Sequence, residues 1–398
     1  MAHVAACPFD FSEQLVFDPS LGQLMADGPV SRIRLPYGEA DAWLVTSFDG
    51  VRQVTTDARF SRAGIVGRDY PRMTPEPIVS PESLNVMDPP RSTRLRHAAA
   101  RAFTQSGVKR MTPAIEQVAH RLVDEMIEHG SPADLVRSLS AQLPNHTICE
   151  LLDVPAADRP LMLRHTQQML TTAPEARQAA AEAKQFLRSY FTALVAERRG
   201  EGGDDLINTM AACEQGEEPL SDDELAVLAL TLILSGNDTA TCQISNFAFT
   251  LLTRSELLDL LRRGPEQLPR LLDELLRHIP FRKGVGIPRV ALEDVKVEGV
   301  LIRAGDFVHV SYLAANRDPA VFADPDALDV DRSPHPHMTF GWGNHHCIAS
   351  TLAIAELGTA IGVLFTRLPG LRLAVPAEAV RWDTRTIRRF PLELPVTW

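Results

Sequence analysis

Two hydrophobic patterns divide the chain. Residues 30–60 and 285–312 contain short stretches in which apolar and polar residues alternate, which is typical of strands. Apolar residues recur at helical spacing over about 90–280 and again over 347–368. We therefore predict a mainly α-helical protein with small β-sheets, including further strands near the C-terminus. Strands on both sides of a helical body favour one domain over residues 1–398 rather than a string of domains.

The helical segment that begins near Ser221 is far more apolar than the others. Ser221 and Glu224 have the spacing of a capping box, in which the two side chains satisfy free backbone amides at a helix start. Between Glu224 and Arg254 the only charged residue is Asp238. Several polar residues around Asp238 make a membrane span costly, so we expect a long core helix. A lone buried carboxylate either is satisfied by hydrogen bonds or handles protons, and this segment alone favours the first role.

Composition and charge narrow the class of protein and its location. Of the 398 residues 45% are hydrophobic, and 40 basic against 51 acidic residues give a net charge of −11. A chain with this balance is not expected to bind nucleic acid. Five scattered cysteines without a CxxC pair indicate a reducing compartment. The first residues lack the pattern of a signal peptide or membrane anchor, so we expect a cytoplasmic protein with no membrane partner.

A cysteine directly before an apolar helix is the strongest candidate for chemistry. Cys347 ends the stretch HMTFGWGNHHC and precedes IASTLAIAELGTAIGVLFTRL. Amides and the dipole at a helix N-terminus stabilise a thiolate. Gly341 and Gly343 would let the chain pass close to a flat ligand, where a Cβ atom would clash. Because a thiolate behind a haem iron favours O–O cleavage, a haem suits this loop.

Zinc is a second interpretation of the same loop. Clusters of histidine and cysteine often bind zinc, and four histidines lie near Cys347 in the sequence. Structural zinc sites usually repeat paired ligands at short spacings, however, and this loop holds one cysteine. The loop alone leaves a haem, a zinc ion and ordinary surface roles open. The four histidines are His335, His337, His345 and His346.

Five separate segments resemble signature motifs of the cytochrome P450 superfamily. Residues 340–347, FGWGNHHC, resemble its cysteine-loop signature FGxGxHxC. A single ExxR would mean little, but five motifs in the family's order are highly specific, and the resemblance extends from about residue 30 to the C-terminus. The other four are Asp88 to Arg96 (the start of the C helix), Ser235 to Thr239 (the oxygen-binding motif), Glu274 to Arg277 (ExxR) and Ala315 to Pro319 (ANRDP).

The resemblance implies the cytochrome P450 fold, with haem b (iron protoporphyrin IX) between the long central helix and the cysteine loop. Cys347 would be the axial ligand of the haem iron. Arg96, Arg289 and His345 match the positions that hold the haem propionates, whose carboxylates suit guanidinium and imidazolium donors. Phe340 is also expected to contact the haem.

The resemblance also implies roles on the oxygen side of the haem and in the core. Asp238 and Thr239 match an acid–alcohol pair that supplies protons through water, so proton handling becomes the favoured role of Asp238. Gly236 would relax the helix there and leave room for oxygen beside the haem. A buried ion-pair network is expected for Glu274, Arg277 and Arg332.

Four residues depart from the family pattern. Ala349 replaces a glycine two residues past the cysteine and adds only a methyl group. Ile354 replaces an arginine of the partner-facing surface, which weakens the expectation of standard ferredoxin docking. Ser92 replaces a histidine that often contacts a propionate, and Ser235 adds a hydroxyl above the haem.

The resemblance implies an oxidoreductase that uses O2 and electrons from ferredoxin and an NAD(P)H-dependent ferredoxin reductase. We predict that it tailors a secondary metabolite by hydroxylation, or by oxidative C–C or C–N coupling of an aromatic or peptide-like substrate such as a cyclic dipeptide. The alternative is a haem-thiolate protein without classical monooxygenation: a peroxide-dependent enzyme, an isomerase or a ligand-binding protein. The residues expected to line a largely apolar substrate pocket are Thr231, Leu234, Ser235, Val285, Ile287 and Thr386.

Overall fold

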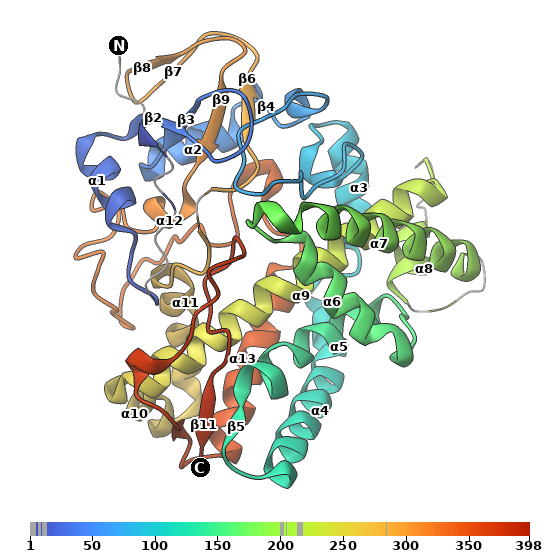
Figure 1. Ribbon diagram of the computed structural model, residues 1–398, viewed down its shortest axis with the longest axis vertical. Helices are drawn as coiled ribbons and strands as arrows, with labels where there is room; N and C mark the ends of the chain where they lie inside the picture. Colours follow the sequence, from blue (N-terminus) through green and yellow to red (C-terminus); the bar gives the residue numbers. More distant parts are fainter. Residues whose placement is uncertain are drawn as a thin grey trace.

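Strands from distant parts of the chain form one sheet. In the computed structural model β2 (Val30–Arg34) pairs antiparallel with β3 (Ala42–Val45), and β3 pairs in parallel with β9 (Phe307–Val310). The full order is β1-β2-β3-β9-β6-β4, and this sheet lies at the top of Figure 1. Two smaller sheets contain β10-β11-β5 and β7-β8. The structure describes residues 5–6, 9, 14–199, 203, 205–212, 218–283 and 285–398.

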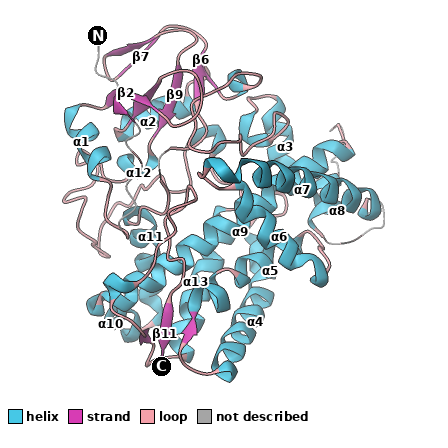
Figure 2. Cartoon of the chain, viewed as in Figure 1, coloured by secondary structure: helices cyan, strands magenta, loops and turns pink. Residues whose placement is uncertain are grey.

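Helices make up most of the described chain outside the sheets, as Figure 2 shows. The mainly α fold class with small sheets is confirmed. The remaining strands are β1 (Ala5–Ala6), β4 (Phe60–Ser61), β5 (Ala133–Asp134), β6 (Arg289–Ala291), β7 (Val295–Val297), β8 (Val300–Ile302), β10 (Arg372–Leu373) and β11 (Pro395–Thr397). The helices are α1 (Pro19–Asp27), α2 (Phe48–Thr56), α3 (Arg91–Ala100), α4 (Gln105–His129), α5 (Gln142–Leu151), α6 (Arg159–Met169), α7 (Arg177–Arg198), α8 (Leu206–Ala211), α9 (Asp222–Thr253), α10 (Ser255–Arg263), α11 (Leu268–His278), α12 (Tyr312–Ala315) and α13 (Ser350–Arg367).

One helix lies where the sequence pattern predicted only strands. The range 30–60 contains α2 between β3 and β4. The Ser47 hydroxyl caps this helix by accepting a hydrogen bond from the Gly50 amide at 3.1 Å. The helix has only nine residues, of which five are buried. Such a short element gives too few helical repeats for periodicity to separate it from its neighbouring strands.

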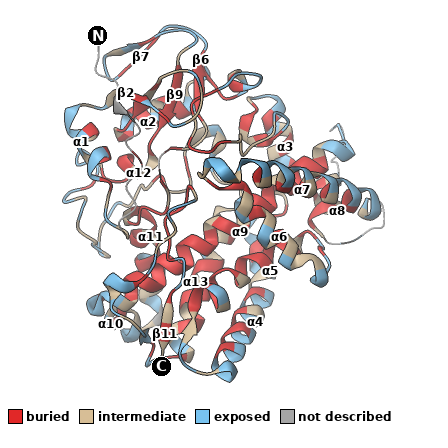
Figure 3. Cartoon of the chain, in the orientation of Figure 1, coloured by how far each residue is buried: buried red, intermediate tan, exposed pale blue. Residues whose placement is uncertain are grey.

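The apolar segment after Ser221 forms the long central helix α9, which crosses the middle of Figure 1. Both bonds of the capping box are present, with Ser221 Oγ accepting from the Glu224 amide and Glu224 Oε2 accepting from the Ser221 amide. Among the described residues α9 is the one helix long and apolar enough to cross a membrane, but 72% of its apolar window is buried inside the protein. Figure 3 shows this burial along the helix. It is therefore the core helix that the sequence predicts.

The helix α13, which follows Cys347, packs against α4 and α9. The helices α5, α6 and α7 pack against α9 as well. The cysteine loop and the middle of the core helix are thereby held close to one another, and the candidate site lies between them.

Candidate active site

A cavity of about 410 Å³ lies between α9 and the loop that precedes α13. Cys347 and Phe340 line it from the loop. Ser235, Gly236 and Thr239 line it from α9. The structure therefore brings the expected iron ligand and residues of the expected oxygen-binding motif to the walls of one cavity.

The backbone around Cys347 fixes the position of its thiol. The Cys347 amide donates a hydrogen bond to the Phe340 carbonyl at 2.8 Å, and α13 begins three residues later. Burial raises the pKa of the Cys347 thiol, while a hydrogen bond from the Ala349 amide and the charge of Arg96 lower it. Iron coordination would offset this effect of burial, because metals bind the deprotonated form of cysteine.

The two glycines of the cysteine loop adopt backbone conformations that other residues rarely adopt. Gly341 has φ 78° and Gly343 has φ 67°. A Cβ atom on Gly343 would lie 2.4 Å from the carbonyl oxygen of Thr55 in α2. The backbone of α2 therefore excludes a side chain at position 343, and the close approach of this glycine to a flat ligand stays a prediction.

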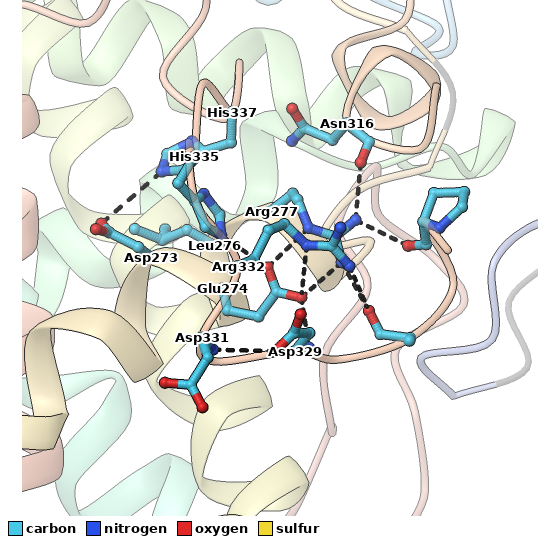
Figure 4. Close-up of polar contacts among 12 residues, drawn as sticks. Asp273, Glu274, Leu276, Arg277, Asn316, Asp329, Asp331, Arg332, His335 and His337 are labelled. Atoms are coloured by element: carbon cyan, nitrogen blue, oxygen red, sulfur yellow. Dashed lines mark hydrogen bonds and ion pairs between the residues drawn. The ribbon is translucent and has the colours of Figure 1, made fainter. Parts of the chain in front are cut away.

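The ion-pair network expected in the core is present and buried (Figure 4). Arg277 donates two hydrogen bonds to the Glu274 carboxylate, at 2.8 and 2.7 Å, and neither side chain is exposed. Arg332 lies 3.5 Å from the same carboxylate. Burial alone would raise the pKa of Glu274, but the hydrogen bonds from Arg277, His335 and the Asp329 amide lower it to about 2. The carboxylate therefore stays ionised at neutral pH.

Asn316 connects this network to the cysteine loop. Its carbonyl oxygen accepts a hydrogen bond from the Arg277 guanidinium at 2.9 Å. Its side chain accepts from the Met338 amide at 2.6 Å and donates to Thr339 Oγ1 at 2.9 Å. The Thr339 hydroxyl in turn donates to the Leu276 carbonyl in α11 at 2.7 Å. The start of the cysteine loop is thus tied to the buried ion pair, which explains how a structural network positions the loop.

Four basic side chains converge beside the cavity. Burial, and after it the charges of Arg62, Arg289 and Arg96, together lower the pKa of His345 to about 2. Arg289 is 1% exposed, yet within the described chain both terminal nitrogens of its guanidinium are buried without a hydrogen-bond partner. Such buried donors are costly unless an acceptor satisfies them. The cluster therefore fits the two carboxylates of a haem.

Arg62 is a member of this cluster that the sequence did not reveal. Its guanidinium donates to the Asn85 carbonyl at 3.1 Å, and its amide donates to the Asp88 carboxylate at 3.0 Å. No local pattern distinguishes Arg62 from a surface arginine.

Ser92, where a histidine was expected, is 1% exposed, and its buried hydroxyl has no partner within the described residues.

Replacing Arg289 with methionine is expected to weaken haem retention. The variant removes two buried donors, and hydrogen bonds to charged groups contribute about 1.5–3 kcal/mol, so haem loss should accelerate roughly ten- to a hundred-fold. Transfer of haem to excess apomyoglobin measures this rate. The matched control is Arg303→Met, which removes an exposed arginine near the same sheet. Equal rates in both variants would contradict the role of Arg289.

The structure pairs Asp238 with an arginine that the sequence analysis did not name. Arg388 Nε donates to Asp238 Oδ2 at 2.6 Å, and both side chains are at least 90% buried. Burial raises the pKa of Asp238, while the charge and hydrogen bond of Arg388 lower it. The helix α9 continues through Gly236, and its expected relaxation there stays a prediction. A Cβ atom on Gly236 would lie 3.3 Å from the Ile148 side chain, so the glycine allows close helix packing.

Most of the residues predicted to face substrate lie on the cavity. Thr386 does not, although the next two residues of the chain, Ile387 and Arg388, do. Two arginines, Arg72 in the 63–86 loop and Arg282, also line the cavity. The predicted residues that line it are Thr231, Leu234, Ser235, Val285 and Ile287.

The histidines that suggested zinc have other contacts. His335 Nε2 lies 2.7 Å from Glu274 Oε2, and His337 lies 4.0 Å from Asp273 (Figure 4). In the part of the chain that the structure describes, no three histidine, cysteine, aspartate or glutamate side chains are placed to hold a metal ion. The arrangement thus favours a haem over a zinc site.

Comparison with known proteins decides the family. The sequence model of the cytochrome P450 family matches residues 266–368. Mycinamicin IV hydroxylase/epoxidase of Micromonospora griseorubida is 43% identical, with 100% of this chain and 99% of the relative covered. The chain belongs to the cytochrome P450 family. Biflaviolin synthase of Streptomyces coelicolor is also 43% identical to this P450, and the match covers 96% of this chain and 93% of the relative.

A solved structure of high similarity is that of a cytochrome P450, P450mel, with biaryl coupling reactivity. It is 57% identical to this P450, covers 100% of both chains and superposes with a TM-score of 0.97. The P450 is therefore an oxidoreductase of the monooxygenase type, and the expected tailoring role in secondary metabolism is confirmed. Membership in the family implies a haem-thiolate cofactor, an O2 co-substrate, redox partners and a small-molecule substrate.

Proposed function

We propose that this P450 couples two phenolic aromatic molecules through a new C–C bond. The observation that carries the proposal is Arg282, a partly buried arginine on a mostly apolar cavity. Burial lowers its pKa to about 10, so it remains a cation at neutral pH. Its Nε atom is buried and has no partner among the described residues. An acidic hydroxyl on an aromatic ring would satisfy this donor, while the ring would fill the apolar remainder of the cavity.

A second arginine and the relatives support the same substrate class. Arg72 lines the cavity too, with its guanidinium held by the carbonyls of Tyr70 and Pro75 at 3.1 and 3.2 Å and paired with the Asp69 carboxylate. Two guanidinium groups on a mostly apolar cavity favour a substrate that carries acidic hydroxyls. The biaryl coupling of P450mel, at 57% identity, points to the same reaction.

The cofactor in this proposal is haem b, held by this chain's own residues. Cys347 would ligate the iron, and Arg62, Arg96, Arg289 and His345 would hold the propionates. When bound, a thiolate-ligated haem supplies the oxidising power that the reaction takes from O2. The overall balance is two aromatic C–H bonds, O2, two electrons and two protons in, and one C–C bond and two molecules of water out.

The protein's own residues would bind, orient and supply protons in this reaction. Arg282 would hold the phenolic oxygen of the substrate by hydrogen bonds. Gly236 and Phe340 would flank the haem, one from α9 and one from the cysteine loop. Asp238 and Thr239 would supply the protons that the formation of water consumes.

We further propose that the electrons come from ferredoxin and a ferredoxin reductase in the cytoplasm. Ile354, which stands where the family usually has an arginine, is 39% exposed on α13. A docking surface around it would therefore be less basic than is usual for the family. Electron transfer should consequently show a weaker dependence on salt concentration than a strongly basic surface would give.

The test uses 1,3-dihydroxynaphthalene as a probe, with a ferredoxin, its reductase and NADPH. We expect a product with twice the mass of the probe less two hydrogens. The dimethoxy analogue, which has no acidic hydroxyl, should give none. Arg282→Met should raise the dissociation constant of the probe about ten-fold, because it removes a charge-assisted hydrogen bond. Arg68→Met, which removes an exposed arginine bonded to the Gly305 carbonyl, is the matched control.

Other products would distinguish the alternatives. A product that gains one oxygen atom would indicate hydroxylation instead of coupling. Turnover with hydrogen peroxide but not with ferredoxin would indicate a peroxide-dependent enzyme. Absence of both products, with equal binding of the probe and its dimethoxy analogue, would contradict the proposed substrate class.

A further inference from the structure

Arg388 contacts both members of the acid–alcohol pair. Its Nε donates to Asp238 Oδ2 at 2.6 Å, and its Nη2 donates to Thr239 Oγ1 at 3.1 Å. Arg388 and Thr239 line the cavity, whereas Asp238 is not among the residues that do. The carboxylate thus lies behind the guanidinium as seen from the cavity. Arg388 comes from the C-terminal segment, 150 residues away from Asp238 in the chain.

The Thr239 hydroxyl differs from the other threonine and serine hydroxyls that form hydrogen bonds along α9. Those hydroxyls donate to the carbonyl four residues earlier, which is the usual arrangement in a helix. Within the described chain, Thr239 makes no such bond to the Ser235 carbonyl, and the one partner of its hydroxyl is Arg388. The hydroxyls that do bond back are those of Thr231, Thr241, Ser245, Thr250 and Thr253.

The chemistry of the guanidinium fixes the direction of the Thr239 hydroxyl. An arginine side chain has five donors and no acceptor, so Thr239 Oγ1 must accept in this contact. The hydroxyl hydrogen is then free to donate to another group. Because Thr239 lines the cavity, that group can be a water molecule or a reacting oxygen within it.

We propose that Arg388 is a positioning residue that turns the Thr239 hydroxyl toward the cavity and holds the Asp238 carboxylate beside it. The inference rests on the proposed function to the extent that Thr239 supplies protons there. Lysine could keep the positive charge near Asp238, but its single ammonium lacks the planar fork that reaches two acceptors in this geometry.

The structural arm of the test is the crystal structure of the haem-loaded Arg388→Met enzyme. We expect the Thr239 hydroxyl to rotate and donate to the Ser235 carbonyl, as its neighbours on α9 do. Arg388→Lys is the second variant, which keeps the charge and guards against misfolding. Arg385→Met, an exposed arginine of the same segment, is the matched control and should leave Thr239 unchanged.

The functional arm measures the hydrogen peroxide released for each NADPH oxidised with 1,3-dihydroxynaphthalene. Both Arg388 variants should release several-fold more peroxide than the wild type, because protons reach the oxygen side of the haem less directly. The dissociation constant of the probe, from the spin-state change on binding, should stay within two-fold. A purely structural role would instead change binding and turnover together. The Arg385→Met control should match the wild type in both measurements.

The two proposals fail in different ways. If the wild type does not couple the probe, the proposed function fails, while the position of Thr239 in the variant crystals still decides the role of Arg388. An unchanged Thr239 in Arg388→Met overturns the positioning role. If the wild type couples the probe and Arg388→Met releases no more peroxide than the wild type, the positioning role is also overturned.

Discussion

Replacing Cys347 with serine is expected to abolish the long-wavelength carbon monoxide band of the reduced enzyme and to lower turnover below about 1%. The thiolate is the source of the electron density that favours O–O cleavage, and a serine hydroxyl does not supply it. The difference spectrum and the product yield measure the two effects. Haem content should fall less than activity, because Arg96, Arg289 and His345 remain to hold the propionates.

The control for this prediction is a buried cysteine elsewhere in the chain. Cys149 is fully buried, and its thiol lies 3.6 Å from Asn145 Oδ1, so a serine there keeps a donor to the same oxygen. Cys149→Ser should retain the carbon monoxide band and most of the activity. A Cys347→Ser enzyme with a normal band would mean that another residue ligates the iron.

Replacing Glu274 with glutamine is expected to destabilise the protein by roughly 3–5 kcal/mol, because it leaves Arg277 as a buried charge without its partner. Haem incorporation should fall together with the stability of the variant, since Asn316 links Arg277 to the cysteine loop. Chemical unfolding and the haem content of purified protein measure these effects. Asp331→Asn, which removes an exposed carboxylate near the same network, should change neither.

The pH dependence of stability gives a second check on Glu274. Its pKa is about 2 in the folded protein against an ordinary value of 4.5. A lowered pKa contributes stability that is fully present above pH 4.5 and is lost as the pH falls toward 2. The stability difference between wild type and Glu274→Gln should therefore shrink over that window. A difference that stays constant from pH 5 to pH 3 would contradict the role of an ionised Glu274.

Local patterns predicted the parts of this protein that neighbouring residues determine. The capping box and apolar run of α9 lie within one segment, and so does the cysteine loop before α13. The short helix α2 was missed because nine residues carry little periodic signal. The lone carboxylate of Asp238 indicated either a hydrogen-bond partner or a proton-handling role. Nothing in the sequence of α9 showed which of the two roles applies or which residue the partner is.

The missed site residues depend on contacts between distant segments. Arg388 lies 150 residues from Asp238, and Arg62 joins Arg289 only when the strands around them assemble. A single sequence gives no measure of such proximity, so these arginines could not be distinguished from those on the surface. The signal that could have found Arg388 is its place two residues past Thr386, a residue already expected to face the substrate.

The contact between Gly343 and α2 limits how this enzyme can be re-engineered. The Thr55 carbonyl occupies the space that a side chain at position 343 would need, and Phe48 packs edge-on against Trp342 with ring centroids 6.1 Å apart. A cysteine loop grafted from another enzyme would therefore meet a surface shaped for this one. Chimeras that exchange the loop together with α2 should retain the haem, whereas exchange of the loop alone should leave the grafted ligand misplaced.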